Sequence, residues 1–151
     1  MTPELRAALR ANADAHRDAQ CEGRAEPDPK PVVKFFNPAG GATWLATELD
    51  ADGDTLFGLA DLGFGQPELG SFSLSELAGV RLPFGLGIER DLLFETPFSL
   101  SVWAAWSRRA GSILWAERLL HRATREGGPT PDDGGPEDRD PEIPTADPGG
   151  G

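Results

Sequence analysis

Three apolar segments in the first half of the chain follow one another too closely for more than one simple arrangement. Residues 32–36, 43–49 and 55–62 each have the composition of a β-strand. Residues 37–41 and 50–54, which connect them, are rich in Gly, Pro, Asn and Asp, as turns are. Parallel strands need crossovers of about a dozen residues, so these segments are predicted to form an antiparallel meander.

The segment after the third strand turns and then starts a helix. Glycines and a proline break the chain between Asp61 and Gly70. Ser73 and Glu76 have the spacing of a capping box, in which each residue caps the backbone amide of the other. Gly79 and Pro83 then limit the helix to a few residues. A fourth strand is predicted over residues 88–94.

Helices are also predicted at both ends of the folded part. One begins at Thr2-Pro3-Glu4, and its thin apolar stripe predicts only weak packing. Another begins at Ser99 or Ser101 and ends before Gly111, and an amphipathic helix follows. The predicted fold class is therefore α+β, with a small antiparallel sheet of about four strands and helices packed on one face.

The last 25 residues differ in composition from the rest. Residues 127–151 contain seven glycines, six prolines and seven carboxylates, and Ile143 is their single large apolar residue. Such a segment cannot bury enough apolar surface to offset its ordering entropy, so it is predicted to be a disordered tail. The predicted organisation is a helix and linker over 1–30, one α+β domain over 31–113, an amphipathic helix over 114–126 and the acidic tail over 127–151.

The net charge of −11 is unevenly distributed. Residues 31–100 contain ten carboxylates and three basic residues, whereas residues 101–126 contain two carboxylates and five arginines. An acidic body argues against non-specific binding of nucleic acid or of an anionic membrane, and it suits a basic protein partner. Cys21 is the single cysteine, and neither a leader peptide nor an apolar run of about 18 residues is present, so a cytoplasmic location is expected.

Several stretches of the chain together resemble a known bacterial family. They are residues 31–38 (PVVKFFNP), 42–49 (ATWLATEL), 57–65 (FGLADLGFG), 67–70 (PELG) and 88–91 (IERD). The family is catalogued as domain of unknown function 2958, and the resemblance covers roughly residues 2–113. It implies an accessory protein of plasmids or other mobile elements and supplies no catalytic residue. The chain departs from the family pattern from Trp115 onward.

The acidic turn at Asp50–Asp54 is the nearest approach to a metal site. With Asp61 it places carboxylates at positions 1, 3, 5 and 12, as in a calcium loop. However, glycine stands at position 4 rather than 6, the last ligand is not Glu, and strands rather than helices flank the segment. A hairpin turn is therefore predicted here, with no metal and no cofactor, and the glycine pairs elsewhere do not extend to a phosphate-binding motif.

The other candidate catalytic groups are isolated in the sequence. His16 and His121 have no partnering acid motif, and no nucleophile motif accompanies them. Trp103 and Trp106 are three residues apart, which predicts that both face the core. Together with Trp115 and the neighbouring arginines, they leave stacking on nucleic-acid bases as an alternative.

The predicted function is that of a non-enzymatic accessory protein acting through protein binding, with acidic charge mimicry as a sharper variant. The predicted contact residues, which we expect to be exposed on loops, are Asp61, Gly63, Phe64, Gly65, Pro67 and Glu68, with Asp52 and Asp54. The alternative is a small metal-dependent hydrolase or nuclease using Asp61, Glu68 or Glu89. A third possibility is direct DNA binding through residues 101–125.

Overall fold

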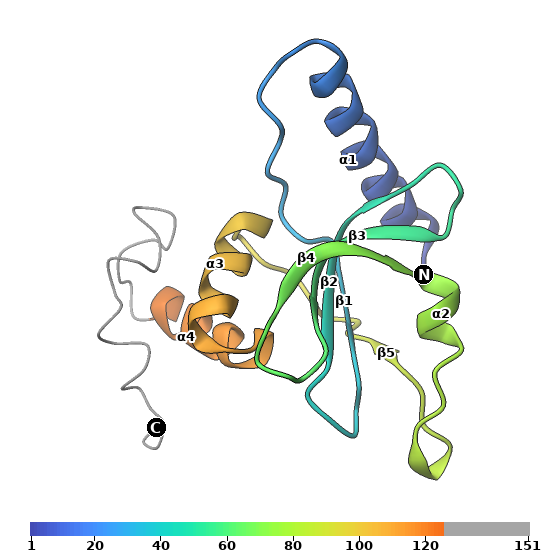
Figure 1. Cartoon of the computed structure of the whole chain (residues 1–151), viewed down its shortest axis with the longest axis vertical. Coiled ribbons are helices and arrows are strands. Elements are labelled where there is room, and N and C mark those ends of the chain that lie inside the picture. The colour runs from blue at the N-terminus through green and yellow to red at the C-terminus, as the bar shows by residue number, and fades with distance from the viewer. Residues whose placement is uncertain (126–151) are drawn as a thin grey trace.

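The structure is a computed structural model, and it describes residues 1–125 (Figure 1). In chain order its elements are α1 (Pro3–Cys21), β1 (Val33–Phe36), β2 (Thr43–Leu49), β3 (Thr55–Asp61), β4 (Glu68–Ser73), α2 (Leu74–Ala78), the 3-10 turn η1 (Pro83–Gly85), β5 (Glu89–Arg90), α3 (Leu100–Ala110) and α4 (Ile113–Arg125). The predicted α+β class is confirmed. The predicted disorder of residues 127–151 lies outside the described residues.

The strands form one sheet in the order β4-β3-β2-β1-β5, and every neighbouring pair is antiparallel. The sheet has five strands rather than about four, because the predicted turn region around Glu68 and Gly70 forms β4 against β3. The predicted strand over residues 88–94 is reduced to Glu89–Arg90. β4 and β5 are the two edges of the sheet.

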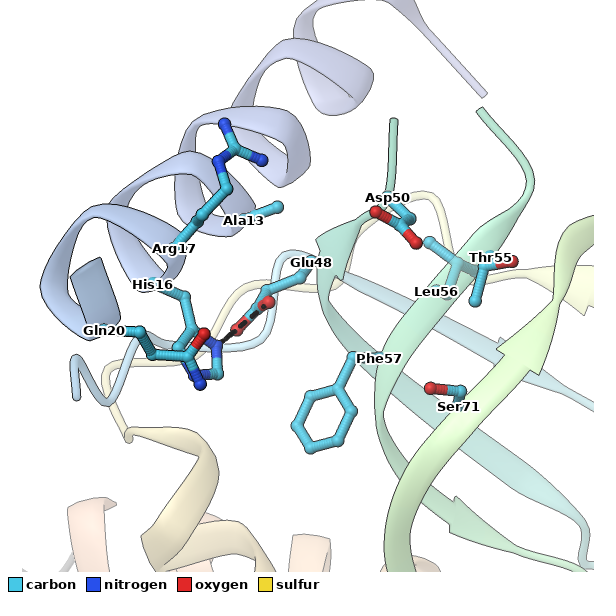
Figure 2. A pocket seen from close by; sticks show the side chains of 10 residues that line it. All are labelled: Ala13, His16, Arg17, Gln20, Glu48, Asp50, Thr55, Leu56, Phe57 and Ser71. Carbon is cyan, nitrogen blue, oxygen red and sulfur yellow. Dashed lines mark hydrogen bonds and ion pairs between the residues drawn. The ribbon is translucent and has the colours of Figure 1, made fainter. Parts of the chain in front are cut away.

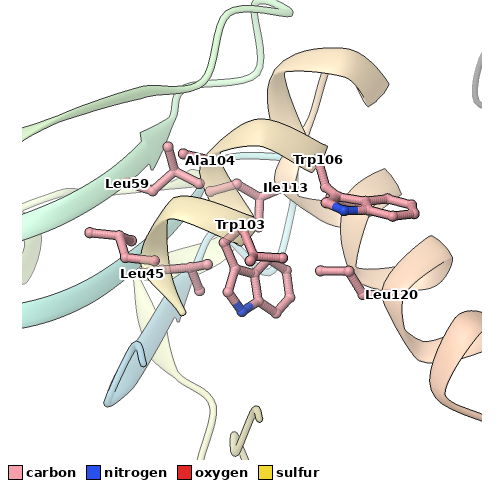
Figure 3. Close-up of a cluster of buried hydrophobic side chains, with 10 residues drawn as sticks. Leu45, Leu59, Trp103, Ala104, Trp106, Ile113 and Leu120 are labelled. Atoms are coloured by element: carbon pink, nitrogen blue, oxygen red, sulfur yellow. The ribbon is translucent and has the colours of Figure 1, made fainter. Parts of the chain in front are cut away.

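Helices cover both faces of the sheet, which corrects the prediction that they lie on one face. On one face, strand side chains pack with α3 and α4 in a cluster that includes Leu45, Leu59, Trp103, Ala104, Trp106, Ile113 and Leu120 (Figure 3). On the other, Val33, Phe35, Trp44, Ala46, Leu49 and Leu56 pack with Leu9 of α1 and Leu77 of α2. The alternation of side chains along each strand produces these two clusters. Trp103 and Trp106 face the core, as predicted.

α1 packs against β2 with more polar contacts than its thin apolar stripe suggested. Thr2 caps its first turn by accepting a hydrogen bond from the Leu5 amide. The Arg10 guanidinium and the Asn12 amide donate to the carbonyl oxygens of Leu49 and Thr47, each at 2.8 Å. These hydrogen bonds supplement the burial of Leu9, so the helix is fixed along β2 despite few apolar residues.

The remaining helices begin and end where the sequence predicts, although the capping groups differ. Ser73 accepts a hydrogen bond from the Glu76 amide at 3.2 Å, which is one half of the predicted capping box. The N-terminus of α2 receives further support from Asp54, which accepts from the Ser75 amide. α3 is capped by Asp28 of the connection between α1 and β1, which accepts from the Ser101 amide at 3.0 Å. Gly111 ends α3 in a left-handed conformation, with φ of 85°.

Candidate binding sites

A polar pocket lies where α1 crosses the sheet (Figure 2). Its volume is about 350 Å³. α1 contributes Ala13, His16, Arg17 and Gln20, and the strands and the β2–β3 turn contribute Glu48, Asp50, Thr55, Leu56, Phe57 and Ser71. The lining combines an imidazole, charged groups and an aromatic ring, which suits a small polar ligand or a polar side chain of a partner.

The centre of this pocket is a histidine–carboxylate pair that joins α1 to β2. Nδ1 of His16 lies 3.0 Å and 3.3 Å from the two carboxylate oxygens of Glu48. Nε2 of the same ring lies 3.5 Å from Glu26, but it is buried and has no hydrogen bond among residues 1–125. The hydrogen bond to Glu48 raises the pKa of His16, while desolvation opposes the shift. The ring therefore lies between two carboxylates from separate segments, Glu48 of β2 and Glu26 of the connection after α1, and both favour its protonated form.

An apolar cleft lies at the β1–β5 edge of the sheet. Its volume is about 680 Å³, and its lining comprises Lys34, Phe36, Asn37, Gly40, Thr43, Glu89, Arg90, Asp91, Leu92, Leu93 and Leu114. Leu92 and Leu93 are 74% and 90% exposed, and Leu114 is 39% exposed. These large apolar side chains lie beside a cleft and have little cover, which is a common feature of protein-binding surfaces.

A buried lysine holds one wall of the cleft in place. Lys34 of β1 donates to both carboxylate oxygens of Glu117 in α4, at 2.9 and 3.0 Å. The carboxylate of Asp91 lies 3.7 Å from the same ammonium group. The lysine side chain is only 9% exposed, and the two carboxylates compensate its buried charge. This ion cluster links β1, α4 and the segment after β5, and it gives the cleft a fixed frame.

The residues predicted to bind a partner around the β3–β4 connection separate into exposed and buried groups. Gly63, Phe64, Gly65 and Glu68 are exposed, and Phe64 is 83% exposed. Pro67 is buried, and Asp61 is fully buried. The expectation that all of these residues are exposed is therefore wrong for Asp61 and Pro67.

Asp61 is buried because its carboxylate anchors backbone. Oδ2 accepts from the Ile113 amide at the start of α4, and Oδ1 accepts from the Gly63 amide, both at 2.9 Å. The carboxylate thus fixes α4 and the following turn to the end of β3. Whether the exposed part of this loop contacts a partner stays a prediction.

The acidic turn between β2 and β3 uses its carboxylates internally. Asp52 accepts from the backbone amides of Asp54 and Thr55 and from the Thr55 hydroxyl, and the hydrogen bonds from Thr55 in particular lower its pKa. The pKa of Asp54 is lowered chiefly by the Ser73 hydroxyl and by the Ser75 amide. Gly53 completes the turn with φ of 73°. The predicted hairpin turn is therefore confirmed.

The two predicted contact regions lie at opposite ends of the sheet. Thr43 pairs with Asp61 at one end of the β2–β3 ladder, and Leu49 pairs with Leu56 at the other. A seven-residue strand separates its ends by about 20 Å. The structure therefore does not combine the acidic turn and the glycine-bounded loop into one compact contact surface.

The acids considered for the metal-dependent enzyme are also kept apart. Glu68 belongs to β4 and Glu89 to β5, at opposite edges of the sheet, and Asp61 is buried between them. Within residues 1–125, no group of three or more His, Cys, Asp or Glu side chains is placed to hold a metal ion. In the same part of the chain, no helix combines the length and apolar character needed to cross a bilayer.

Sequence reasoning missed the His16–Glu48 pair and the apolar cleft. The two residues of the pair are separated by 32 positions, and no local motif connects them. Leu92 and Leu93 did carry a signal, since two adjacent leucines cannot both face the core of a strand that is covered on one side. The sequence prediction placed both leucines in one strand over residues 88–94 and so did not recognise them as exposed.

Five antiparallel strands with helices on both faces define the chain as a small α+β domain. Comparison with family models then gives its relationship: the chain belongs to the family described as protein of unknown function (DUF2958), whose model matches residues 1–114. The resemblance noted in the sequence is thereby confirmed. No curated protein and no solved structure matches the chain. The family match ends in the first turn of α4, so the rest of that helix lies beyond it.

Proposed function

We propose that this protein is a non-enzymatic binding module that holds an extended apolar segment of another protein in the cleft beside β5. The observation that carries the proposal is the exposure of Leu92 and Leu93, 74% and 90%, next to a cleft of about 680 Å³. When a partner covers a water-exposed leucine pair, the free energy falls, because apolar surface leaves water.

The edge position of β5 supports the same mode of binding. On one side, β5 pairs with β1 through Glu89 and Arg90. Its other side forms the edge of the sheet. An extended segment can add to such an edge through backbone hydrogen bonds while its side chains enter neighbouring pockets. Glu89 and Arg90 would then supply charge selectivity beside the apolar contacts.

The charge of the domain indicates the kind of partner. Residues 31–100 contain ten carboxylates and three basic residues, which favours association with a protein whose surface is basic around the apolar segment. The family resemblance adds the proposal that this partner belongs to the host of a mobile element. Acidic mimicry of a nucleic acid would act through the same long-range attraction.

The test compares variants of the full chain as baits in a host-cell lysate. Leu92→Ser with Leu93→Ser removes the apolar pair, whereas Phe84→Ser alters a residue that is 98% exposed on η1 and does not line the cleft. Phe64→Ser tests the loop that the sequence suggested. We expect a protein that the wild type, Phe84→Ser and Phe64→Ser retain and that the leucine variant loses.

A photo-crosslinking residue at position 93 then tests whether the protein that the leucine variant loses contacts the cleft directly. Recovery of the same proteins by all four baits would refute the assignment to the cleft. Loss with Phe64→Ser alone would instead place the contact on the loop after β3.

A further inference from the structure

The outer face of α4 carries a row of arginines that the folded part of the chain leaves without acidic partners. Arg118, Arg122 and Arg125 are exposed, and their spacing places them on one side of the helix. We call these three residues the arginine stripe. On the opposite side, Ile113, Ala116 and Leu120 are buried against α3 and the sheet. The packing of this side fixes the orientation of α4, so the stripe faces solvent.

No acid among residues 1–125 neutralises the stripe. Glu117 is the single carboxylate of α3 and α4, and Lys34 binds both of its oxygens. The Arg118 guanidinium lies over the Trp115 ring, 5.4 Å from its centroid, which leaves its charge uncompensated. No ion pair involves the three guanidinium groups within the described residues.

The sequence that follows α4 has the complementary charge. Residues 132–140 contain Asp132, Asp133, Glu137, Asp138 and Asp140 against Arg139. The stripe and this acidic segment both lie beyond residue 114, where the family match ends.

We propose that the acidic segment 132–140 binds the arginine stripe of the same chain and shields it from external polyanions. Asp132 lies seven positions after Arg125, a length of chain that spans at most about 25 Å. The stripe is about 10 Å long at 1.5 Å per residue, so the chain can reverse direction and lie along it.

Because the acidic segment is part of the same chain as the arginine stripe, several weak contacts can together hold it there. A tethered segment has an effective concentration in the millimolar range, which favours the intramolecular contact over a dilute external anion. The contact is electrostatic between exposed groups, so it must weaken as salt screens the charges. None of the three arginines lines the cleft beside β5, and this inference does not depend on the proposed function.

The experiment measures proximity in the full chain by NMR. A nitroxide at Gly135→Cys, in a Cys21→Ser background, broadens amides that approach it. The matched control carries the same label with Asp132, Asp133, Glu137, Asp138 and Asp140 replaced by their amides, so that the tether is unchanged and only charge is lost. We expect stronger broadening of residues 118–125 in the charged chain, and we expect the excess to disappear in 1 M salt, where the Debye length is about 3 Å.

A second variant and a competitor complete the test. Arg118→Gln with Arg122→Gln and Arg125→Gln should remove the excess broadening while the rest of the spectrum stays unchanged. A single-stranded oligonucleotide at low salt should bind the stripe of the chain with the amide-substituted tail at least tenfold more tightly than that of the wild type. Equal broadening in the charged and neutral tails, or equal oligonucleotide affinity, would overturn the proposal.

Discussion

Replacing Asp61 by alanine tests whether this carboxylate maintains the fold or serves a partner. The side chain is fully buried. Its two oxygens accept from the Ile113 and Gly63 amides, each at 2.9 Å, and so join the end of β3 to α4 and to the β3–β4 loop. A residue with this role should affect the free energy of unfolding of the isolated protein, with no partner present.

The expected loss follows from the two donors. The Ile113 amide is buried, so removal of its acceptor costs about 1–3 kcal/mol, and the partly exposed Gly63 hydrogen bond adds about 0.5–1.5 kcal/mol. The expected total of about 2–4 kcal/mol is a large part of a typical stability of about 5–15 kcal/mol. Asp61→Asn keeps one carbonyl oxygen as an acceptor, so its loss of stability should be smaller than that of Asp61→Ala. Some loss should remain, because the NH₂ group faces the second donor.

Urea unfolding of the full chain, followed by tryptophan fluorescence, measures these differences. Trp103 and Trp106 of α3 are buried in the cluster that α3 and α4 form with the sheet, and so report on this part of the core. Glu68→Ala is the matched control, because Glu68 is an exposed carboxylate of β4 and should change stability by no more than about 0.5 kcal/mol. A loss below about 0.5 kcal/mol for Asp61→Ala would refute the anchoring role.

Three further perturbations probe other parts of the molecule. Gly58→Ala should weaken the fold by about 3 kcal/mol or more, because the added Cβ would lie 1.8 Å from the Leu45 carbonyl oxygen. Gly70→Ala, at the paired position of β4, should be tolerated, because its Cβ meets nothing within 4 Å; a similar loss for both in urea would contradict this account. The pKa of His16 is raised by its hydrogen bond to Glu48, so the stability it contributes is fully present below the unfolded pKa of about 6.5 and is lost as pH rises through the folded value. The difference in unfolding free energy between wild type and His16→Asn should therefore shrink as the pH rises above about 6.5, and a constant difference would argue against a charged ring. Millimolar calcium should leave the Tm unchanged, because the carboxylates of Asp52 and Asp54 already accept hydrogen bonds from the turn and from α2; a rise in Tm would show a bound ion.

The parts of the fold that sequence could predict are those fixed by local chemistry. The meander of β1, β2 and β3 follows from turn residues between short apolar segments, and the limits of α1 and α3 follow from Thr2 and Gly111. β4 was missed because Gly70 and two serines give it little strand propensity. Pairing with β3 determines its conformation, and such pairing has no local signal in one sequence.

The sites were less predictable than the fold because they depend on long-range contacts. Turn chemistry alone explains Asp61 in the sequence, and only the arrival of α4 reveals that the carboxylate is buried. Gly58 likewise shows no sequence reason for being glycine, since the close approach of the β2 backbone creates the requirement. His16 and Glu48 meet because α1 crosses β2, and no spacing rule connects residues on such elements.

The layout of the sheet limits where an extended partner segment can bind. Helices cover both faces, so backbone groups can be offered to a partner strand at the edges β4 and β5. β4 presents Glu68 and the half-exposed Leu69 and follows a loop with the exposed Phe64, whereas β5 is followed by two leucines that are more than 70% exposed and line a cleft. A cleft lets a partner side chain bury more apolar surface than a protruding loop does, so binding at β5 is favoured over binding at β4. The same geometry explains why the acidic turn and the glycine-bounded loop, which are about 20 Å apart, cannot serve one short peptide together.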